Sequence, residues 1–371
     1  MEKSGRGKEI DAELISIHSI DVTETIILTG GLKARSCDDE CVQIYPFWRD
    51  GEPIWGEHIP CDNFLKFLKE RSVDIIGIKQ DTRAGDGNHW RWAPAKACHN
   101  PPHNNPSYRW RFLSSGICRS VNSGETLSVI GAKSNETISE VDAKKLSDLA
   151  RHIAIDLHHL NHAIAMMAEY LHIELVSQGP RSRRYSHIRS LDLSAYVHGF
   201  FQVFSAARDH YAQFLAIQIG QKKVEGEKID SMFNLLNASE PSQLRQLKII
   251  KLLEQKNLLE VGKGKRRHTG RSRLVYKSDT WLKYSNDLRN RFTHGSPYGT
   301  MEGEDMTEIL QPDGDRAMFL AKTFLDKGEG EFTPDLLRTI NNLYQGVCAL
   351  FLIASEVTGY KYDPLSVNLK S

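Results

Sequence analysis

Three residues that could carry out acid–base and phosphate chemistry stand close together late in the chain: Arg289, Asn290 and His294. Histidine exchanges a proton near neutral pH, so it can act as a general acid or base. Arginine carries a permanent charge and donates a fork of hydrogen bonds to phosphate oxygens. These residue types suffice to cleave RNA without a metal ion. Arg291, which lies between Asn290 and His294, is a further candidate for holding the RNA backbone.

The three residues fall at the end of a helix predicted over residues 279–294, where a Gly-Ser-Pro sequence follows. Asn290 and His294 are four positions apart and share a face of that helix. Arg289 is about 140° away from His294 around an ideal helix. Its long side chain must therefore wrap around the helix, or two helix ends must face one cleft in a symmetric dimer. The alternative is an ordinary helix end, where cations favour the helix dipole.

The second half of the chain has the periodicity of long helices. Apolar residues recur every three or four positions over residues 139–177, and this stretch opens with a sequence that resembles a capping box. A Gly-Pro pair ends it. Further helices are predicted over 193–220, 228–236 and 241–256, and a last one ends near 358. This order fits an up-down helical bundle.

The motif and this order of helices resemble the HEPN family (higher eukaryotes and prokaryotes nucleotide-binding domain). Its motif is Arg, a polar residue that is often Asn, three variable positions and His. The resemblance covers about residues 140–360. It implies a metal-independent endoribonuclease of the kind found in toxin–antitoxin and antiviral-defence systems, with RNA as partner. It also implies a homodimer in which both motifs line one groove.

The resemblance assigns a role to each motif residue. The 2′-OH of RNA would attack the adjacent phosphodiester, with His294 as general base or acid. Arg289 would stabilise the charge of the transition state, and Asn290 would position the phosphate or the histidine. HEPN proteins often place a polar or acidic residue on the helix that faces the motif, and Asp209 and His210 are the candidates here. A solvated polar strip on an amphipathic helix is the alternative for these two.

A basic insertion at about 258–277 precedes the motif helix, and one short strand is predicted on each side of its cations. The cations at the tip of such a hairpin can neutralise several phosphates of a nucleic acid, and the affinity for the nucleic acid then depends strongly on salt concentration. Together with the helix at 242–255 it also resembles half of a winged helix. The alternative function is therefore a non-catalytic module that binds nucleic acid or another ligand. The predicted RNA-binding residues are Lys263, Lys265, Arg266, Arg267, Arg271 and Arg273.

Residues 1–137 are predicted to form a mixed α/β domain that senses a trigger or binds a regulatory partner. Its β-branched and aromatic stretches are bounded by turn residues, as in short strands. Strands are predicted at 14–20, 25–28, 42–47, 73–78, 108–113 and 126–130, and a helix at 62–71. The predicted fold class is α+β: this domain, then an all-α HEPN-like bundle over 138–371 that carries the basic insertion.

Cysteine and histidine pairs in this first domain are weak zinc candidates. Cys37 precedes Cys41 by four positions, and Cys98 precedes His103 by five, which is near the spacing of structural zinc sites but matches no standard motif. His58 and Cys61 are among the further candidate ligands. We expect no metal and no other cofactor.

Composition limits the remaining classes. The 371 residues carry a net charge of +1, which excludes a globally basic nucleic-acid binder but not a local basic groove. No apolar run approaches the length of a membrane span, and the charged first residues do not resemble a signal sequence. Six cysteines suit a reducing compartment. These features predict a cytoplasmic protein without membrane contact.

Overall fold

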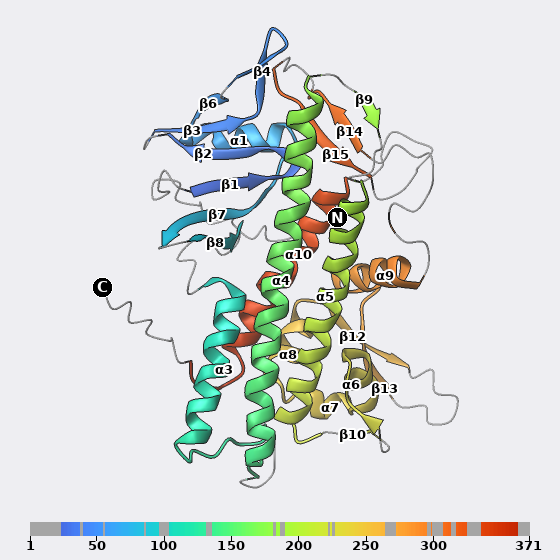
Figure 1. Cartoon of the computed structure of the whole chain (residues 1–371). Coiled ribbons are helices and arrows are strands. Elements are labelled where there is room, and N and C mark those ends of the chain that lie inside the picture. Colours follow the sequence, from blue (N-terminus) through green and yellow to red (C-terminus); the bar gives the residue numbers. More distant parts are fainter. Residues whose placement is uncertain are drawn as a thin grey trace, which may run out of the picture.

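One long helix, α4 (Glu140–Gln178), extends along most of the molecule, and the other elements pack around it (Figure 1). The hydroxyl of Ser139 caps its start by accepting a hydrogen bond from the backbone N–H of Asp142 at 3.2 Å. Gly179 follows its end with a left-handed φ of 68°, a conformation that favours glycine. The predicted cap and the predicted end of this helix are confirmed.

The computed structural model describes most of the chain, and its ranges are 24–37, 40–54, 56–84, 87–95, 104–130, 136–180, 183–185, 190–221, 223–224, 227–263, 272–294, 298, 307–312, 317–324 and 335–362. The strand predicted at 14–20 lies outside these residues. A sheet formed near the N-terminus is followed mainly by helices, so the predicted mixture of α and β structure is confirmed.

Helices that follow α4 match the predicted ones closely. The second long helix is α5 (Ser190–Gln218), which packs along α4, and the last is α10 (Leu336–Glu356). The two short helices predicted between them are three in the structure: α6 (Met232–Ala238), α7 (Pro241–Leu244) and α8 (Lys248–Gln255). The predicted basic hairpin follows as the strands β12 (Leu259–Lys263) and β13 (Ser272–Tyr276), and the motif helix is α9 (Trp281–His294).

A six-stranded antiparallel sheet packs beside the upper half of α4 (Figure 1). Its order is β6 (Glu57–Pro60), β3 (Cys41–Tyr45), β2 (Lys33–Ser36), β1 (Glu24–Leu28), β7 (Ile75–Ala84) and β8 (Gly87–Pro94). The 3-10 turn η2 (Thr29–Gly31) joins β1 to β2 against α4, and the hairpin of β4 (Phe47–Arg49) and β5 (Glu52–Ile54) and the helix α1 (Cys61–Glu70) complete this region. The strands predicted at 25–28, 42–47 and 73–78 and the helix at 62–71 are therefore confirmed.

The strand predicted at 108–113 is wrong, because this segment belongs to the helix α3 (Pro106–Asn122). Alternating rings and arginines gave a two-residue period, but the segment starts with strong helix signals. The Asn105 side chain accepts a hydrogen bond from the N–H of Ser107 at 3.0 Å, and proline occupies the first helical position. Trp110, Leu113 and Ile117 then form the buried face at helical spacing. The strand predicted at 126–130 is also wrong: Ser128 forms only an isolated bridge with Thr137.

The region predicted to be all-α also contains strands. β9 (Arg183–Tyr185), β14 (Thr307–Leu310) and β15 (Leu320–Thr323) form a three-stranded sheet with β14 in the centre, and β10 (Lys223–Val224) pairs with β11 (Glu227–Lys228). The segment just before β15 contacts the N-terminal region, since the N–H of Trp48 donates to the carbonyl of Ala317 at 2.9 Å. The description "all-α" is therefore wrong for residues 138–371.

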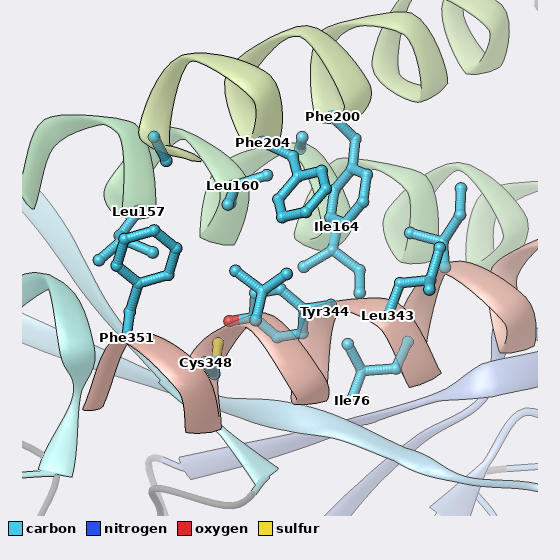
Figure 2. Close-up of a cluster of buried hydrophobic side chains, with 14 of the residues drawn as sticks. Ile76, Leu157, Leu160, Ile164, Phe200, Phe204, Leu343, Tyr344, Cys348 and Phe351 are labelled. Atoms are coloured by element: carbon cyan, nitrogen blue, oxygen red, sulfur yellow. The ribbon is translucent and has the colours of Figure 1, made fainter. Parts of the chain in front are cut away.

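One continuous hydrophobic core joins the sheet to the helices. Figure 2 shows Tyr344, Cys348 and Phe351 of α10 packed against α4, α5 and Ile76 of the sheet. The Tyr344 hydroxyl accepts from Trp92 Nε1 at 2.8 Å and donates to Asn161 Oδ1 at 2.6 Å, so β8, α10 and α4 share one buried hydrogen-bonded chain. A buried network of this kind is favourable only when every polar group in it has a hydrogen-bond partner, and this requirement fixes the relative position of the three elements.

The inner face of α10 also binds the start of β7 and the residue before it. The side chain of Asn341 donates to the carbonyl of Ile75 at 3.2 Å, and that of Gln345 donates to the carbonyl of Ile76 at 2.8 Å. Arg338 pairs with Asp74 at 2.7 Å. In the described part of the chain, α10 is the one helix long and apolar enough to cross a membrane, but more than half of that window is buried in this core. Core packing therefore accounts for its apolar composition.

Candidate active site

The Arg-Asn-x3-His motif lies on the last turns of α9. Leu288 and Phe292 are buried on the inner side of this helix, while Asn290 and His294 are exposed on the other side, as their four-residue separation predicts. Arg289 is half-buried between these two sides and donates from a terminal guanidinium nitrogen to Asn290 Oδ1 at 3.0 Å. The arginine thus reaches around the helix toward the Asn290 face.

Aromatic packing holds this helix end against α5. The ring of Phe292 lies 5.3 Å from that of Phe201 and 6.0 Å from that of His198, measured between ring centroids. His198 Nε2 accepts from the backbone N–H of Tyr298 at 3.1 Å, and the hydroxyl of Ser194 donates to the carbonyl of Tyr298. Burial raises the pKa of the Tyr298 phenol, which keeps it neutral. The packing of Phe292 and the hydrogen bonds of Tyr298 therefore hold the helix end that carries the motif in a fixed position.

The two supporting candidates on α5 have partners other than the motif. His210 Nδ1 lies 2.7 Å from Asp156 Oδ2 on α4, with the ring of His152 5.1 Å away. Asp209 accepts from the backbone N–H of Met232 at 3.3 Å and lies beside Arg208. His210 thus faces α4, and Asp209 holds the start of α6.

Arg208 is an α5 side chain that forms a hydrogen bond to a side chain of the motif helix, and sequence reasoning missed it. Its guanidinium donates to Asn286 Oδ1 at 2.8 Å, one turn before Asn290. One position along a helix rotates a side chain by about 100°, so the choice between neighbours 208, 209 and 210 needs the register of the two helices. The Arg-Asp-His sequence alone could not give that register.

The His210–Asp156 pair should make stability depend on pH. The hydrogen bond to Asp156 raises the pKa of His210 above its usual 6.5, against a smaller opposing effect of burial. Because the folded-state pKa is the higher one, the pair stabilises the folded chain fully below about pH 6.5, and this contribution disappears as the pH rises through the folded-state pKa. In an NMR titration, Asp156→Asn should lower the His210 pKa, whereas Asp148→Asn, on the same helix, should leave it unchanged. An unchanged pKa in the Asp156→Asn chain would show that the pair does not form.

The predicted hairpin is confirmed, with Leu259 opposite Tyr276 and Lys263 opposite Ser272. Arg273 is half-buried, and its guanidinium donates to Asn237 on α6, so this predicted RNA-binding residue also ties the hairpin to the bundle. The side chain of Lys263 and the other cations predicted to bind RNA lie outside the described residues: Lys265, Arg266, Arg267 and Arg271. Arg291 is exposed on α9, with its guanidinium 6.0 Å from the centre of the Phe292 ring.

An open groove of about 930 Å³ lies between α3 and α4. It is rich in arginine and hydroxyl side chains: Tyr108, Arg111, Ser115, Arg119, Arg151 and His158 are among those that line it. Arg151 also pairs with Asp148 at 2.7 Å. The helical conformation of α3 creates this groove, because it places Arg111 and Arg119 along the side of the groove opposite α4.

Of the weak zinc candidates, Cys37 and Cys41 lie together and are joined by His58. Cys98 and His103 lie outside the described residues. Comparison of the chain with protein-family models, with curated proteins and with solved structures found no match.

Proposed function

We propose that the chain is a metal-independent endoribonuclease that acts as a homodimer in the cytoplasm, as a toxin or an antiviral-defence effector. The observation that carries the proposal is the arrangement of Arg289, Asn290 and His294 on the exposed end of α9. The ring of Phe292 packs against that of Tyr298, which holds this helix end in place. A packed support with exposed, proton-exchanging and phosphate-binding groups is what a nuclease site requires.

In this proposal the three side chains divide the reaction between them. His294 removes the proton of the attacking 2′-OH or protonates the leaving 5′-oxygen. Arg289 stabilises the negative charge that grows on the phosphate, and a guanidinium has donors to spare beyond its one bond to Asn290. Asn290 orients Arg289 and contacts the phosphate. One chain supplies a single motif histidine, so a symmetric dimer would supply both the acid and the base.

The proposal is tested by incubating the purified chain with a mixed RNA pool in the presence of a chelator. The expected products carry 2′,3′-cyclic phosphate ends, because the nucleophile is the neighbouring 2′-OH. Arg289→Ala should lower the cleavage rate by about 100- to 1000-fold, the usual cost of removing one donor to a developing charge. Lys283→Ala, which removes a cation paired with Asp287 on the same helix, should not. Products with 3′-OH ends, or activity lost with the chelator, would exclude this mechanism.

The groove between α3 and α4 favours a second candidate function, a binding module for RNA or another phosphate-bearing ligand. Its arginines could bind phosphates while no bond is cleaved. In that case Arg111→Gln should weaken RNA binding and reduce its dependence on salt, while Arg289→Ala should change neither. The reverse result would favour the nuclease.

A further inference from the structure

Three metal-ligating side chains meet at one edge of the six-stranded sheet. Cys37 follows β2, Cys41 begins β3, and His58 lies on the edge strand β6. The ligand atoms of the three all lie within 4.8 Å of one another, and Cys41 Sγ is 3.5 Å from His58 Nδ1. The cysteines are 4 positions apart in sequence, but the histidine comes 17 positions after Cys41, so the fold itself brings the third side chain in.

The strand register explains this meeting. The N–H of Cys37 donates to the carbonyl of Cys41 at 3.1 Å, which closes the turn between β2 and β3 with one cysteine on each side. Between β3 and β6, Cys41 is opposite Pro60 and Gln43 is opposite His58. His58 is therefore the diagonal neighbour of Cys41 on the same face of the sheet, a relation in which long side chains touch.

We propose that Cys37, Cys41 and His58 bind a zinc ion. Tetrahedral zinc takes thiolates at about 2.3 Å and imidazole nitrogen at about 2.0–2.1 Å, which places neighbouring ligand atoms roughly 3.3–3.8 Å apart. The three atoms need only small movements to reach this geometry. Two soft thiolates and one imidazole select zinc over magnesium or calcium, whose sites are built from oxygen ligands. Binding releases the thiol protons to solvent, since thiolates are the ligands.

The side chain of Gln43 lies behind the histidine, on the side away from the cysteines. Gln43 Nε2 lies 3.5 Å from His58 Nε2, the ring nitrogen that points away from the cysteines. Arg35 in turn donates from Nε to Gln43 Oε1 at 2.8 Å, which fixes the amide. When Nδ1 binds zinc, Nε2 carries the remaining ring proton and donates, so the Gln43 amide must turn to present Oε1 to the histidine and give up its bond from Arg35. A fourth ligand, water or a further side chain, would complete the tetrahedron.

The metal would join the turn between β2 and β3 to an edge strand of only four residues. Short edge strands have ladder hydrogen bonds on one side alone, so a metal crosslink would contribute directly to the order of this edge. The site belongs to the region predicted to sense a trigger and is built from none of the motif residues of α9. It therefore stands independently of the proposed nuclease.

The test uses the full chain, purified without a metal-affinity step. Elemental analysis should find about one zinc per chain, and titration against a chromophoric chelator should show that His58→Ala weakens zinc binding at least about 100-fold. His58→Cys, which replaces one ligand by another, should retain zinc. Cys118→Ser, which removes an exposed thiol on α3, is the matched control and should bind zinc as the unchanged chain does.

Cobalt gives a second readout that does not depend on stability. The thiolate-to-cobalt absorption of the Co²⁺-loaded chain should fall by roughly half in Cys37→Ser, because one of two thiolates is gone. The proposal fails if the unchanged chain neither contains zinc nor binds added Zn²⁺. It also fails if Cys98→Ser abolishes zinc binding while Cys41→Ser preserves it, since the metal would then be held elsewhere. RNA cleavage enters none of these measurements.

Discussion

A chain that carries His294→Ala should cleave RNA about 100- to 10,000-fold more slowly than the unchanged chain, the usual contribution of a positioned general acid or base. The loss should appear in the rate of the chemical step under single-turnover conditions, while the affinity for RNA changes little. His294 is exposed at the end of α9, so its replacement leaves the core intact. The free energy of unfolding of the His294→Ala chain should stay within about 0.5 kcal/mol of that of the unchanged chain.

The matched control is His159→Ala, since this histidine is also exposed on a helix, α4, but belongs to no motif. It should leave the cleavage rate unchanged. Equal activity of the His294→Ala and unchanged chains would remove the catalytic role, whatever the RNA affinity. A loss of cleavage together with a large loss of stability would instead point to a structural role for this helix end.

Replacement of Trp110 by alanine should lower the free energy of unfolding by about 3–5 kcal/mol, as expected for the largest core side chains. Trp110 is fully buried, and its indole N–H donates to the carbonyl of Phe351 at 2.9 Å. Its ring meets Tyr211 and Phe214 edge-on, at 5.6 and 5.3 Å between centroids. The substitution therefore opens a cavity where α3, α5 and α10 meet, and it should appear as a lower urea midpoint.

Two comparisons identify the cause of this loss. Trp110→Phe keeps most of the ring contacts but removes the N–H, and should cost about 1–2 kcal/mol. Tyr284→Ala removes a partly exposed aromatic ring on α9 and should change stability by no more than about 0.5 kcal/mol. If Trp110→Ala cost less than 1 kcal/mol, α3 would not pack as described, and the helical assignment of residues 106–122 would be in error.

Local signals in the sequence were enough wherever an element is specified by its own residues. The cap at Ser139, the Gly-Pro stop after α4 and the strand pair around the basic insertion are all of this kind. Residues 108–113 show where such signals compete. Rings and arginines alternate there with a strand-like period, and the strand predicted from that period is wrong. The Asn-Pro start and the spacing of Trp110, Leu113 and Ile117 specify the helix instead.

Relations between distant segments could not be read from the sequence. β9 pairs with β14 across more than 100 residues of sequence. The two strands have only three and four residues, too few to show an alternation of apolar and polar residues. The same limit applies to the sites. The motif helix was predicted with its exposed face, but the α5 side chain that hydrogen-bonds to it is Arg208 rather than the predicted Asp209 or His210. His58 lies beside the two cysteines because of the register between β3 and β6. Each of these depends on how two elements are aligned.

The hydrogen bonds from α10 to Ile75 and Ile76 have a consequence for synthesis on the ribosome. Translation delivers the first sheet early, but the helix that covers Ile76 and completes the hydrogen bond of Trp92 ends only at residue 356. Early segments of a nascent chain ordinarily fold as they emerge. Here the face of the sheet to which Ile76 belongs stays without its partner helix until α10 has been made, long after the last strand of the sheet.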